Sequence, residues 1–237
     1  MGAPFIFKQF TIHQDRSSMK VGTDGVLLGA WASVDNQPNT ILDIGTGTGL
    51  IALQMAQRTS AELIDAIELD DETYEQCVAN FEESPWSDRL FCYHADFMEF
   101  VDEVEDNYDL IISNPPFYEE EVTSGNSSRD RARQTKSLPF DELLGGVAKL
   151  LSHNGLFAVI LPFKEERRFL EMGKRSGLYP KRITRVKGSP SAEIKRSMLE
   201  MRFSEGEPKV GELVIELARH QYTKAYSELT SPFYLKM

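Results

Sequence analysis

One segment of the chain reads Ile41-Leu42-Asp43-Ile44-Gly45-Thr46-Gly47-Thr48-Gly49 and continues into Leu50-Ile51-Ala52-Leu53. The apolar residues before the glycines predict a buried strand, and the pattern from Leu50 to Arg58 predicts a helix. Glycines permit a tight turn between the two and let a ligand approach the backbone closely. In a doubly wound α/β fold, a nucleotide-like ligand crosses the strand ends at such a turn.

Strand-like and helical segments alternate along the following part of the chain. Apolar runs occur at residues 63–67, 90–93, 110–112 and 156–161, and helical stripes at 74–81 and 140–151. This alternation predicts a parallel sheet that helices cover on both faces. After Gly177 the pattern becomes strand after strand, at 183–186, 198–203 and 213–217. That change predicts an antiparallel edge at the C-terminal end of an α/β sheet.

Length and composition are those of an ordinary globular protein. The chain has 237 residues, 41% of them hydrophobic and 27% charged, which favours a single domain. We expect a core at residues 36–176, with an extension at 1–35 and an antiparallel edge and tail at 177–237. Two cysteines, four scattered histidines and the lack of a signal peptide or an apolar run of about 18 residues predict a cytoplasmic protein without a metal site.

Charge is distributed unevenly along the chain. The formal net charge is −11, but residues 163–202 contain 12 Lys and Arg against 5 Asp and Glu. A smaller basic group includes Arg129 and Arg131. These stretches fit a surface that faces phosphates, and they also fit ordinary solvated helix and strand faces.

The segment Asn114-Pro115-Pro116-Phe117 directly follows the apolar run Tyr108–Ser113. It places an amide, two rigid prolines and an aromatic ring at the tip of a predicted strand. The Asn114 side-chain oxygen and the Pro115 carbonyl can each accept one N–H of a planar amino group, while Phe117 covers its π-face. A proline-rich turn is the alternative interpretation.

Two carboxylates follow the glycine loop at the ends of the next predicted strands. Glu68 stands 19 residues after Gly49, where a carboxylate can accept both hydroxyls of a ribose, and Asp96 can accept from an adenine amino group. The loop reads Gly-x-Gly-x-Gly, whereas a dinucleotide site normally has Gly-x-Gly-x-x-Gly, and hydride transfer gives Asn114 no role. S-adenosylmethionine needs an adenosine site and a nucleophile opposite its methyl group, which these residues offer.

These motifs, in this order, resemble the class I S-adenosylmethionine-dependent methyltransferases that act on planar amino nitrogens. The N-terminal segments Lys8–Arg16 and Met19–Trp31, with Gly22-Thr23-Asp24 inside the second, make the chain similar to the bacterial enzymes that methylate N6 of adenosine 37 in a valine tRNA. The resemblance implies a Rossmann-like methyltransferase fold: a doubly wound, mostly parallel seven-stranded sheet with an antiparallel C-terminal edge. It also implies that residues 1–35 cover the cofactor.

The resemblance assigns residues to three groups. The residues expected to act in catalysis are Asn114, Pro115, Pro116 and Phe117. Many relatives have Tyr at the position of Phe117. S-adenosylmethionine binding falls to Gly22, Thr23, Asp24, Asp43, Gly45, Thr46, Gly47, Gly49, Glu68, Leu69, Asp96, Phe97 and Asn114. Contact with the tRNA substrate is expected of Phe117, Arg129, Arg131, Lys187, Lys195 and Arg196.

The sequence leaves several substrates open. A clamp for a planar amine fits N6 of adenine in RNA or DNA, N4 of cytosine, N2 of guanine in rRNA, and the amide of a protein glutamine. The basic segment favours RNA. A binding module that keeps the fold without catalysis is a further alternative, which the intact clamp and glycine loop disfavour. No membrane, metal or obligate protein partner is expected.

Overall fold

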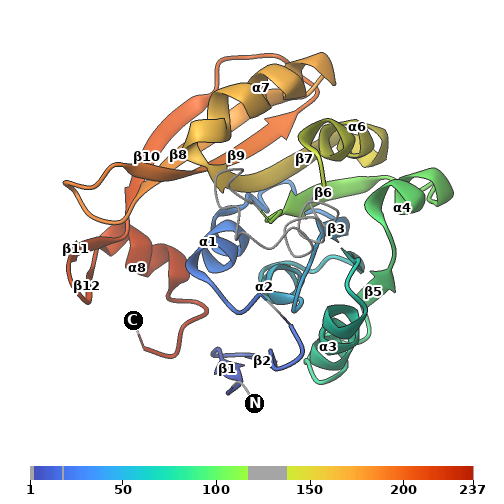
Figure 1. Cartoon of the computed structure of the whole chain (residues 1–237), viewed down its shortest axis with the longest axis horizontal. Helices are drawn as coiled ribbons and strands as arrows, with labels where there is room; N and C mark the ends of the chain where they lie inside the picture. Colours follow the sequence, from blue (N-terminus) through green and yellow to red (C-terminus); the bar gives the residue numbers. More distant parts are fainter. Residues whose placement is uncertain (1–2, 18, 117–137, 237) are drawn as a thin grey trace, which may run out of the picture.

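An eight-stranded sheet runs through the centre of the molecule, in the order β10-β8-β9-β7-β6-β3-β4-β5 (Figure 1). The computed structural model describes residues 3–17, 19–116 and 138–236. The strands of this sheet are β3 (Thr40–Ile44), β4 (Leu63–Glu68), β5 (Leu90–His94), β6 (Tyr108–Ser113), β7 (Leu151–Pro162), β8 (Tyr179–Lys187), β9 (Ile194–Arg202) and β10 (Lys209–Val214). The predicted α/β fold is confirmed.

The sheet differs in detail from the prediction. It has eight strands rather than seven, and β9 alone runs against its neighbours, pairing antiparallel with β7 and with β8. The edge strand β10 pairs parallel with β8, so the C-terminal edge is only partly antiparallel. The chain crosses from β9 past β8 to reach this position. A pattern of successive strands does not reveal such a crossing, which is why the sequence indicated only antiparallel neighbours.

Helices cover both faces of the sheet (Figure 1). They are α1 (Thr23–Trp31), α2 (Leu50–Arg58), α3 (Asp71–Glu82), α4 (Phe97–Glu103), α6 (Phe140–Leu150), the short 3₁₀ helix η1 (Phe163–Glu165), α7 (Glu166–Arg175) and α8 (Lys224–Thr230). Asp70 and Asp96 cap α3 and α4, because their side chains accept hydrogen bonds from first-turn N–H groups. After β4 and β5, a polar residue thus starts the next helix.

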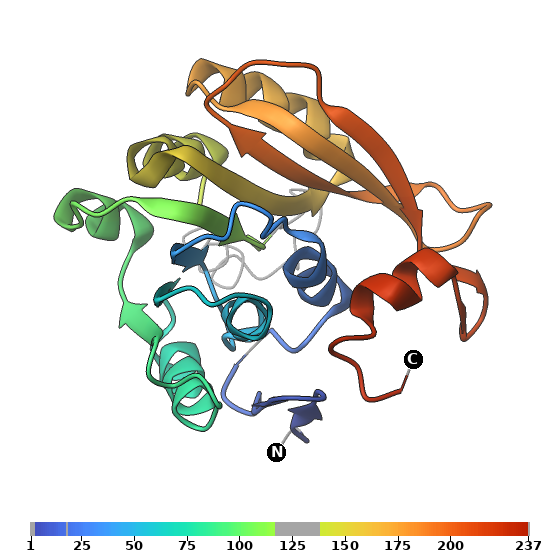
Figure 2. The same ribbon diagram turned by 180° about the vertical axis from the view of Figure 1, so that it is seen from behind.

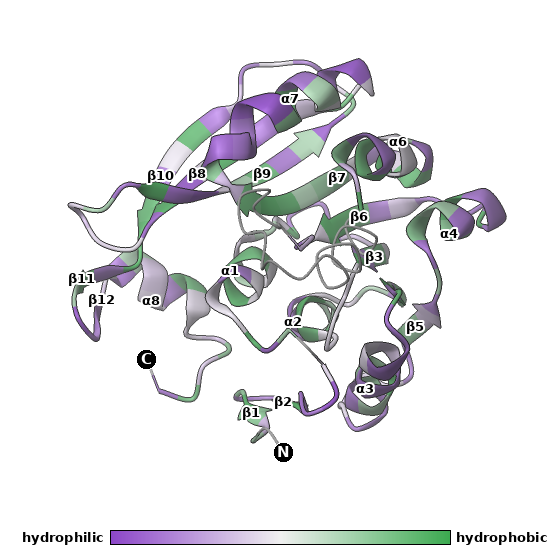
Figure 3. Ribbon diagram, in the orientation of Figure 1, coloured by the Kyte–Doolittle hydropathy of each residue, from purple (hydrophilic) through white to green (hydrophobic). Residues whose placement is uncertain are grey.

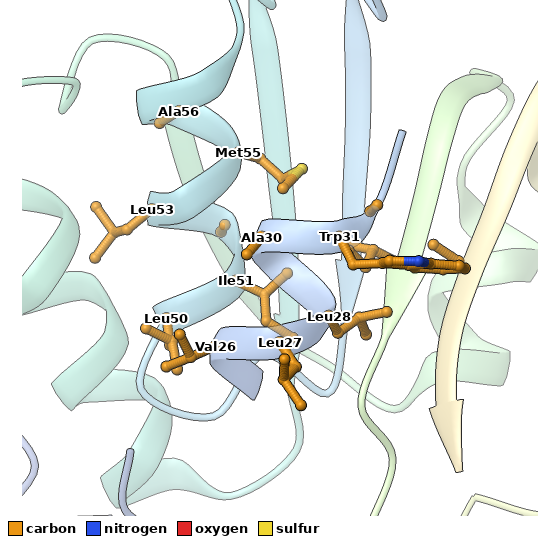
Figure 4. Packing of buried hydrophobic residues seen from close by; sticks show 14 of the residues in the cluster. Val26, Leu27, Leu28, Ala30, Trp31, Leu50, Ile51, Leu53, Met55 and Ala56 are labelled. Carbon is orange, nitrogen blue, oxygen red and sulfur yellow. The ribbon is translucent and has the colours of Figure 1, made fainter. Parts of the chain in front are cut away.

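The core consists of two apolar clusters, one on each face of the sheet. Ile41 faces the cluster with α1, α2 and α3, while its neighbour Leu42 faces the cluster with α4, α6 and α7. Successive strand residues point to opposite faces, so a strand buried on both sides is apolar throughout. Figure 3 shows the hydrophobic colouring of the central strands, and Figure 4 shows buried side chains of the first cluster that α1 and α2 contribute.

Two small antiparallel pairs lie outside the main sheet, β1 (Phe5–Ile6) with β2 (Thr11–Ile12) and β11 (Glu216–Ala218) with β12 (Gln221–Tyr222). The N-terminal pair meets the C-terminal tail, since Phe7 forms a β-bridge with Tyr234 and the Lys8 N–H donates to the Phe233 carbonyl at 2.8 Å. Figures 1 and 2 show both ends on the same side of the molecule.

Helix α1 is fixed to the far part of the sheet by polar contacts. The Trp31 indole N–H donates to Thr184 Oγ1 at 3.0 Å, and the Arg182 guanidinium lies 3.9 Å from the centre of the Trp31 ring. Arg182 also forms an ion pair at 2.6 Å with Glu200, which is buried. These contacts tie the N-terminal segment to β8 and β9.

Candidate active site

A cavity of about 250 Å³ opens at the carboxyl ends of β3, β4 and β6. The last residues of these strands, Ile44, Glu68 and Ser113, line it. Because the connections from β3 and β6 leave in opposite directions, this is the switch point where α/β sheets bind ligands. The cavity brings together nine predicted residues: Gly45, Gly47, Glu68, Leu69, Asp96, Phe97, Asn114, Pro115 and Pro116.

The glycine loop forms the floor of the cavity. Gly45 and Gly47 have φ values of 66° and 60°, and a Cβ on either would meet nothing within 4 Å. The left-handed conformation favours glycine, and the open space leaves the backbone exposed to a ligand. Gly49 has a different role. A Cβ there would lie 2.5 Å from the Phe81 ring, so this glycine serves the packing of α2 on α3 and does not line the cavity.

Glu68 is held in place by two backbone amides. Its carboxylate accepts from the Gly47 N–H at 2.9 Å and from the Asp70 N–H at 2.8 Å. Each carboxylate oxygen has a second lone-pair site. Glu68 can therefore fix the glycine loop and still accept two neighbouring hydroxyl groups from a ligand.

Asp96 and Phe97 line another part of the cavity. One oxygen of Asp96 caps α4 by accepting from Met98 and Glu99, which leaves the other oxygen available to an amino group. The Phe97 ring and the half-exposed Leu69 supply apolar surface for a flat ring system. This part has the chemistry of an adenine site.

The Phe97 ring rests against a glycine on α6. A Cβ at Gly146 would lie 2.4 Å from Phe97 Cε1 and 2.9 Å from Val101 Cγ2. Gly146→Ala should therefore push the ring into the cavity, with about 1–3 kcal/mol of lost stability from overpacking. We expect the dissociation constant of S-adenosylhomocysteine to rise about tenfold, which calorimetry measures.

The adjacent glycine is a matched control for that substitution. A Cβ at Gly145 meets nothing within 4 Å. Gly145→Ala should leave affinity unchanged and stabilise α6 slightly, because alanine is the better helix former. Equal affinity in both variants would show that the Phe97 ring position does not matter for the ligand.

Asp43 lies buried beneath the glycine loop. Its Oδ2 accepts from the Thr46 hydroxyl at 2.6 Å and from the Ala52 N–H at 3.2 Å. Its Oδ1 is buried and has no hydrogen-bond partner among the residues that the structure describes. Burial raises the pKa of Asp43 to about 7, against the lowering effect of the two hydrogen bonds. Neither Asp43 nor Thr46 lines the cavity, so both support the loop from behind.

This pKa predicts a pH-dependent stability. Between pH 4 and 7 the folded protein keeps the Asp43 proton that the unfolded chain releases, so stability falls as the pH rises and levels off above 7. Asp43→Asn should match the wild type near pH 4 and be the more stable protein at pH 8, by at most about 4 kcal/mol. Urea unfolding at both pH values measures the difference in stability between the two proteins. If that difference were the same at both pH values, the pKa of Asp43 in the folded protein would not lie near 7.

The Asn114 clamp meets the N-terminus of α1. A Cβ on Gly25 would lie 3.8 Å from Asn114 Nδ2, so the glycine lets the helix approach the amide closely. Pro115 and Pro116 complete this wall of the cavity. Phe117, Arg129 and Arg131 lie outside the described residues.

Other predicted residues lie near the cavity without lining it. Gly22, Thr23 and Asp24 begin α1, and Asp24 forms an ion pair with Arg196 at 2.7 Å. The same N-terminal segment instead contributes Ser17 and Met19 to the lining. Sequence reasoning missed these two and also Leu138, Pro139 and Glu142, which close the cavity from the α6 side. Met19 is 51% exposed. In the sequence, only the family resemblance of the segment Met19–Trp31 indicated that this part of the chain lies near the cofactor.

The predicted RNA-contacting residues of the C-terminal segment lie at the same sheet edge as the cavity. Arg196 pairs with Pro162 at the carboxyl end of β7, and Lys187 pairs with Ile194. Several cations of this segment have acidic partners: Arg182 with Glu200, Arg185 with Glu166, Lys187 with Glu212 and Arg196 with Asp24. Lys195 is exposed and has no ion pair within the described part of the chain.

The described residues lack two features, a metal-binding cluster and a membrane-spanning helix. Residues 3–17, 19–116 and 138–236 contain no group of three His, Cys, Asp or Glu side chains placed to hold a metal ion. In the same ranges, no helix combines the length and the apolar composition that crossing a bilayer requires.

Known proteins resemble this chain over its whole length. A model of the family described as "Methyltransferase small domain" matches residues 23–137. The tRNA1(Val) (adenine(37)-N6)-methyltransferase of Christiangramia forsetii is 56% identical over 99% of this chain and 98% of that protein. Proteins of the same name are 57% identical in Flavobacterium johnsoniae, over 98% and 100%, and 44% identical in Bacteroides fragilis, over 100% of both.

Solved structures share the fold at much lower identity. A predicted O-methyltransferase of Agrobacterium tumefaciens, Atu636, matches with a TM-score of 0.69 and 18% identity over 89% of this chain and 96% of that one. TYW2 of Pyrococcus horikoshii, solved with MeSAdo, gives 0.58 and 15% over 85% and 71%. From the sequence identities and the family model, the chain belongs to the methyltransferase family that comprises the tRNA1(Val) (adenine(37)-N6)-methyltransferases.

Proposed function

We propose that the protein transfers a methyl group from S-adenosylmethionine to N6 of adenosine 37 in a valine tRNA. One observation carries this proposal: a single cavity is lined both by Gly47, Glu68 and Asp96 and by the clamp Asn114–Pro116. The names of the similar proteins supply the substrate. Since tRNA is a cytoplasmic molecule, we also propose that the protein acts in the cytoplasm.

The residues present fit the cofactor. Glu68 can accept from the ribose hydroxyls, the free oxygen of Asp96 from the adenine amino group, and the open backbone at Gly45 and Gly47 can border the methionine part. Asp43 places its buried carboxylate behind that loop. Bound there, S-adenosylmethionine supplies a methyl group on a positively charged sulfur.

Asn114 and Pro115 orient the amine that receives this methyl group. The lone pair of an adenine amine is delocalised into the ring, so the amine is a weak nucleophile. Two acceptors, the Asn114 side-chain oxygen and the Pro115 carbonyl, can hold both N–H groups and free the lone pair for attack. Asn114 is neutral and too weak a base to take the proton, so proton loss follows methyl transfer. Most of the acceleration then comes from positioning.

The target base must leave its stack to reach the clamp. This step costs a few kcal/mol and is easier in a loop than in a duplex. We propose that Phe117 stacks on the base and that Arg129 and Arg131 act nearby, although these residues lie outside the described part. We also propose that residues 1–35 cover the cofactor, with Ser17 and Met19 as the contacts that support this.

Three cations lie at the sheet edge that holds the active site: Lys187, Lys195 and Arg196. We propose that they contact RNA phosphates. Affinity for tRNA should then fall steeply with added salt, because bound phosphates release counterions. Lys195→Gln should lower the slope of log affinity against log salt by about one. Filter binding at several salt concentrations measures it. A flat response would favour the rival substrate, a glutamine side chain in a protein.

The proposed function is tested by mass spectrometry of nucleosides from a valine tRNA transcript incubated with the protein and cofactor. The expected product is N6-methyladenosine, absent when adenosine 37 is replaced by guanosine. Methylated guanine in place of N6-methyladenosine, or no transfer to the tRNA at all, would each contradict the assignment. The second outcome would favour a protein glutamine as the substrate or a binding module without catalysis.

A further inference from the structure

A second cavity of about 250 Å³ lies at the sheet edge opposite the active site. It forms where β9 ends between β7 and β8, at the side where Arg202 pairs with Tyr179, the first residue of β8. Its lining residues include Asn36, His153, Lys181 and Arg202. The proposed reaction uses none of these residues.

Irregular strand pairing builds this cavity from both sides. On β7, Leu151 pairs with Tyr108 and Leu156 with Leu110, so five steps on β7 match two on β6 and three extra residues are inserted. His153 and Asn154 lie in that insertion. On β8, Pro180 pairs with Met201 and Arg182 with Glu200, which leaves Lys181 as an extra residue. Bulges redirect side chains and often accompany binding sites.

The charge in this cavity has one sign. Among the described residues, its lining contains Lys181, Arg202 and His153 and no Asp or Glu. The carboxylate of Asp109, near the start of β6, is engaged elsewhere, since it accepts from the Asn39 N–H at 2.9 Å and from the Ser152 hydroxyl at 3.1 Å. The cations therefore lack an acidic partner in the cavity wall.

Arg202 shows an unsatisfied donor at this site. Its Nε is buried and has no hydrogen-bond partner among the described residues. A buried donor without an acceptor is unfavourable, and a guanidinium bonded to an oxyanion is among the strong pairs in proteins. A small rotation of the Arg202 side chain towards an oxyanion in the cavity would give Nε the missing acceptor.

We propose that this cavity binds a small dianionic phosphate, either inorganic phosphate or a phosphomonoester. Lys181 and Arg202 together carry two positive charges, which match a phosphomonoester dianion, while a phosphodiester of an RNA backbone carries one. The recessed site between two bulges also suits a small ligand better than a duplex. The protein thus has a second ligand site, separated from the cofactor cavity by the length of the strands.

The test is an NMR titration of the full chain with inorganic phosphate in chloride buffer at constant ionic strength. The backbone amides of His153, Asn154 and Lys181 should shift in a saturable manner. Arg202→Gln should weaken binding about tenfold or more. Arg167→Gln changes an arginine on α7 whose side chain is 91% exposed and should leave the affinity unchanged. If Arg202→Gln does not fold, Lys181→Gln takes its place with the same expectation.

Further titrations identify the kind of phosphate. Methyl phosphate should bind like inorganic phosphate, and dimethyl phosphate, a phosphodiester monoanion, should bind at least about tenfold more weakly. Shifts that grow linearly without saturation, or saturable shifts that the Arg202 and Lys181 variants leave unchanged, would overturn the proposal. Equal binding of dimethyl phosphate would also overturn it and would indicate an RNA backbone contact.

Discussion

Asn114→Ala should lower kcat for tRNA methylation by at least about 10³-fold, because the variant loses one of the two acceptors proposed to orient the target amine. The dissociation constant for S-adenosylmethionine should change by no more than about threefold, a difference below 0.7 kcal/mol. Asn114 lies on the wall formed by the chain after β6, whereas Glu68 and Asp96, proposed to bind the ribose and the adenine, line other parts of the cavity. Single-turnover kinetics with saturating cofactor separate the two quantities.

Asn107→Ala is the matched control for this substitution. Asn107 lies directly before β6, at the end far from Asn114, and its side chain donates to the Lys149 carbonyl at 3.3 Å. Its removal should leave kcat and cofactor affinity as they are. If Asn114→Ala lost cofactor affinity and turnover by the same factor, the residue would be a cofactor ligand and the clamp would need another acceptor.

Glu68→Gln should show the opposite pattern: affinity for S-adenosylmethionine should fall, and kcat should change little. The amide replaces the charged group that we propose accepts from two ribose hydroxyls, and it also sets an N–H group against the N–H of Gly47 or Asp70. Hydrogen bonds to charged groups contribute about 1.5–3 kcal/mol each, so the dissociation constant for S-adenosylmethionine should rise about 10²-fold. At saturating cofactor, kcat should stay within about threefold of the wild type, since the group does not touch the reacting atoms.

Calorimetric titration of cofactor and initial rates at high cofactor concentration check this result. Glu72→Gln is the control, because Glu72 is an exposed carboxylate in the first turn of α3 and does not line the cavity. If the Glu68 variant kept wild-type affinity, the ribose of the cofactor would not bind at the end of β4. A variant whose kcat fell at full saturation would place Glu68 nearer to the methyl group than proposed.

Much of the fold was predictable because two local signals agree. The spacing of apolar residues and the residues that begin or end helices and strands indicate the same elements. Residues 41–58 form β3 and α2 as predicted, and Asp70 caps α3 as its position suggests. The pairing of β10 with β8 depends on which strands meet in space, and no local pattern encodes it. For the same reason, a resemblance that implied seven strands missed the eighth.

The site was predictable to the extent that its residues follow strand ends. Gly47, Glu68, Asp96 and Asn114 meet in one cavity because parallel strands bring their carboxyl ends to one edge. Lining residues from outside those ends, such as Met19 and Glu142, carry no comparable signal in the sequence. Their places depend on how the N-terminal segment and α6 pack.

The basic segment shows why charge counts alone do not define a surface. Arg182 and Arg185 fall in a stretch rich in Lys and Arg, yet they hold the buried carboxylates of Glu200 and Glu166. A buried carboxylate needs a partner, so part of the excess charge serves the fold. Lys195 keeps an exposed charge at the active-site edge and is the cation of this segment chosen for the salt test.

A crystal structure of the protein with S-adenosylhomocysteine tests the central claim, that donor and acceptor share the cavity between the glycine loop and the clamp. The ribose hydroxyls should bind the Glu68 carboxylate, and the sulfur should point towards Asn114 and Pro115. Between the sulfur and the clamp there should be room for one methyl group and an amine at about 3–3.5 Å. A sulfur that points away from Asn114, or a ligand bound outside this cavity, would contradict the account.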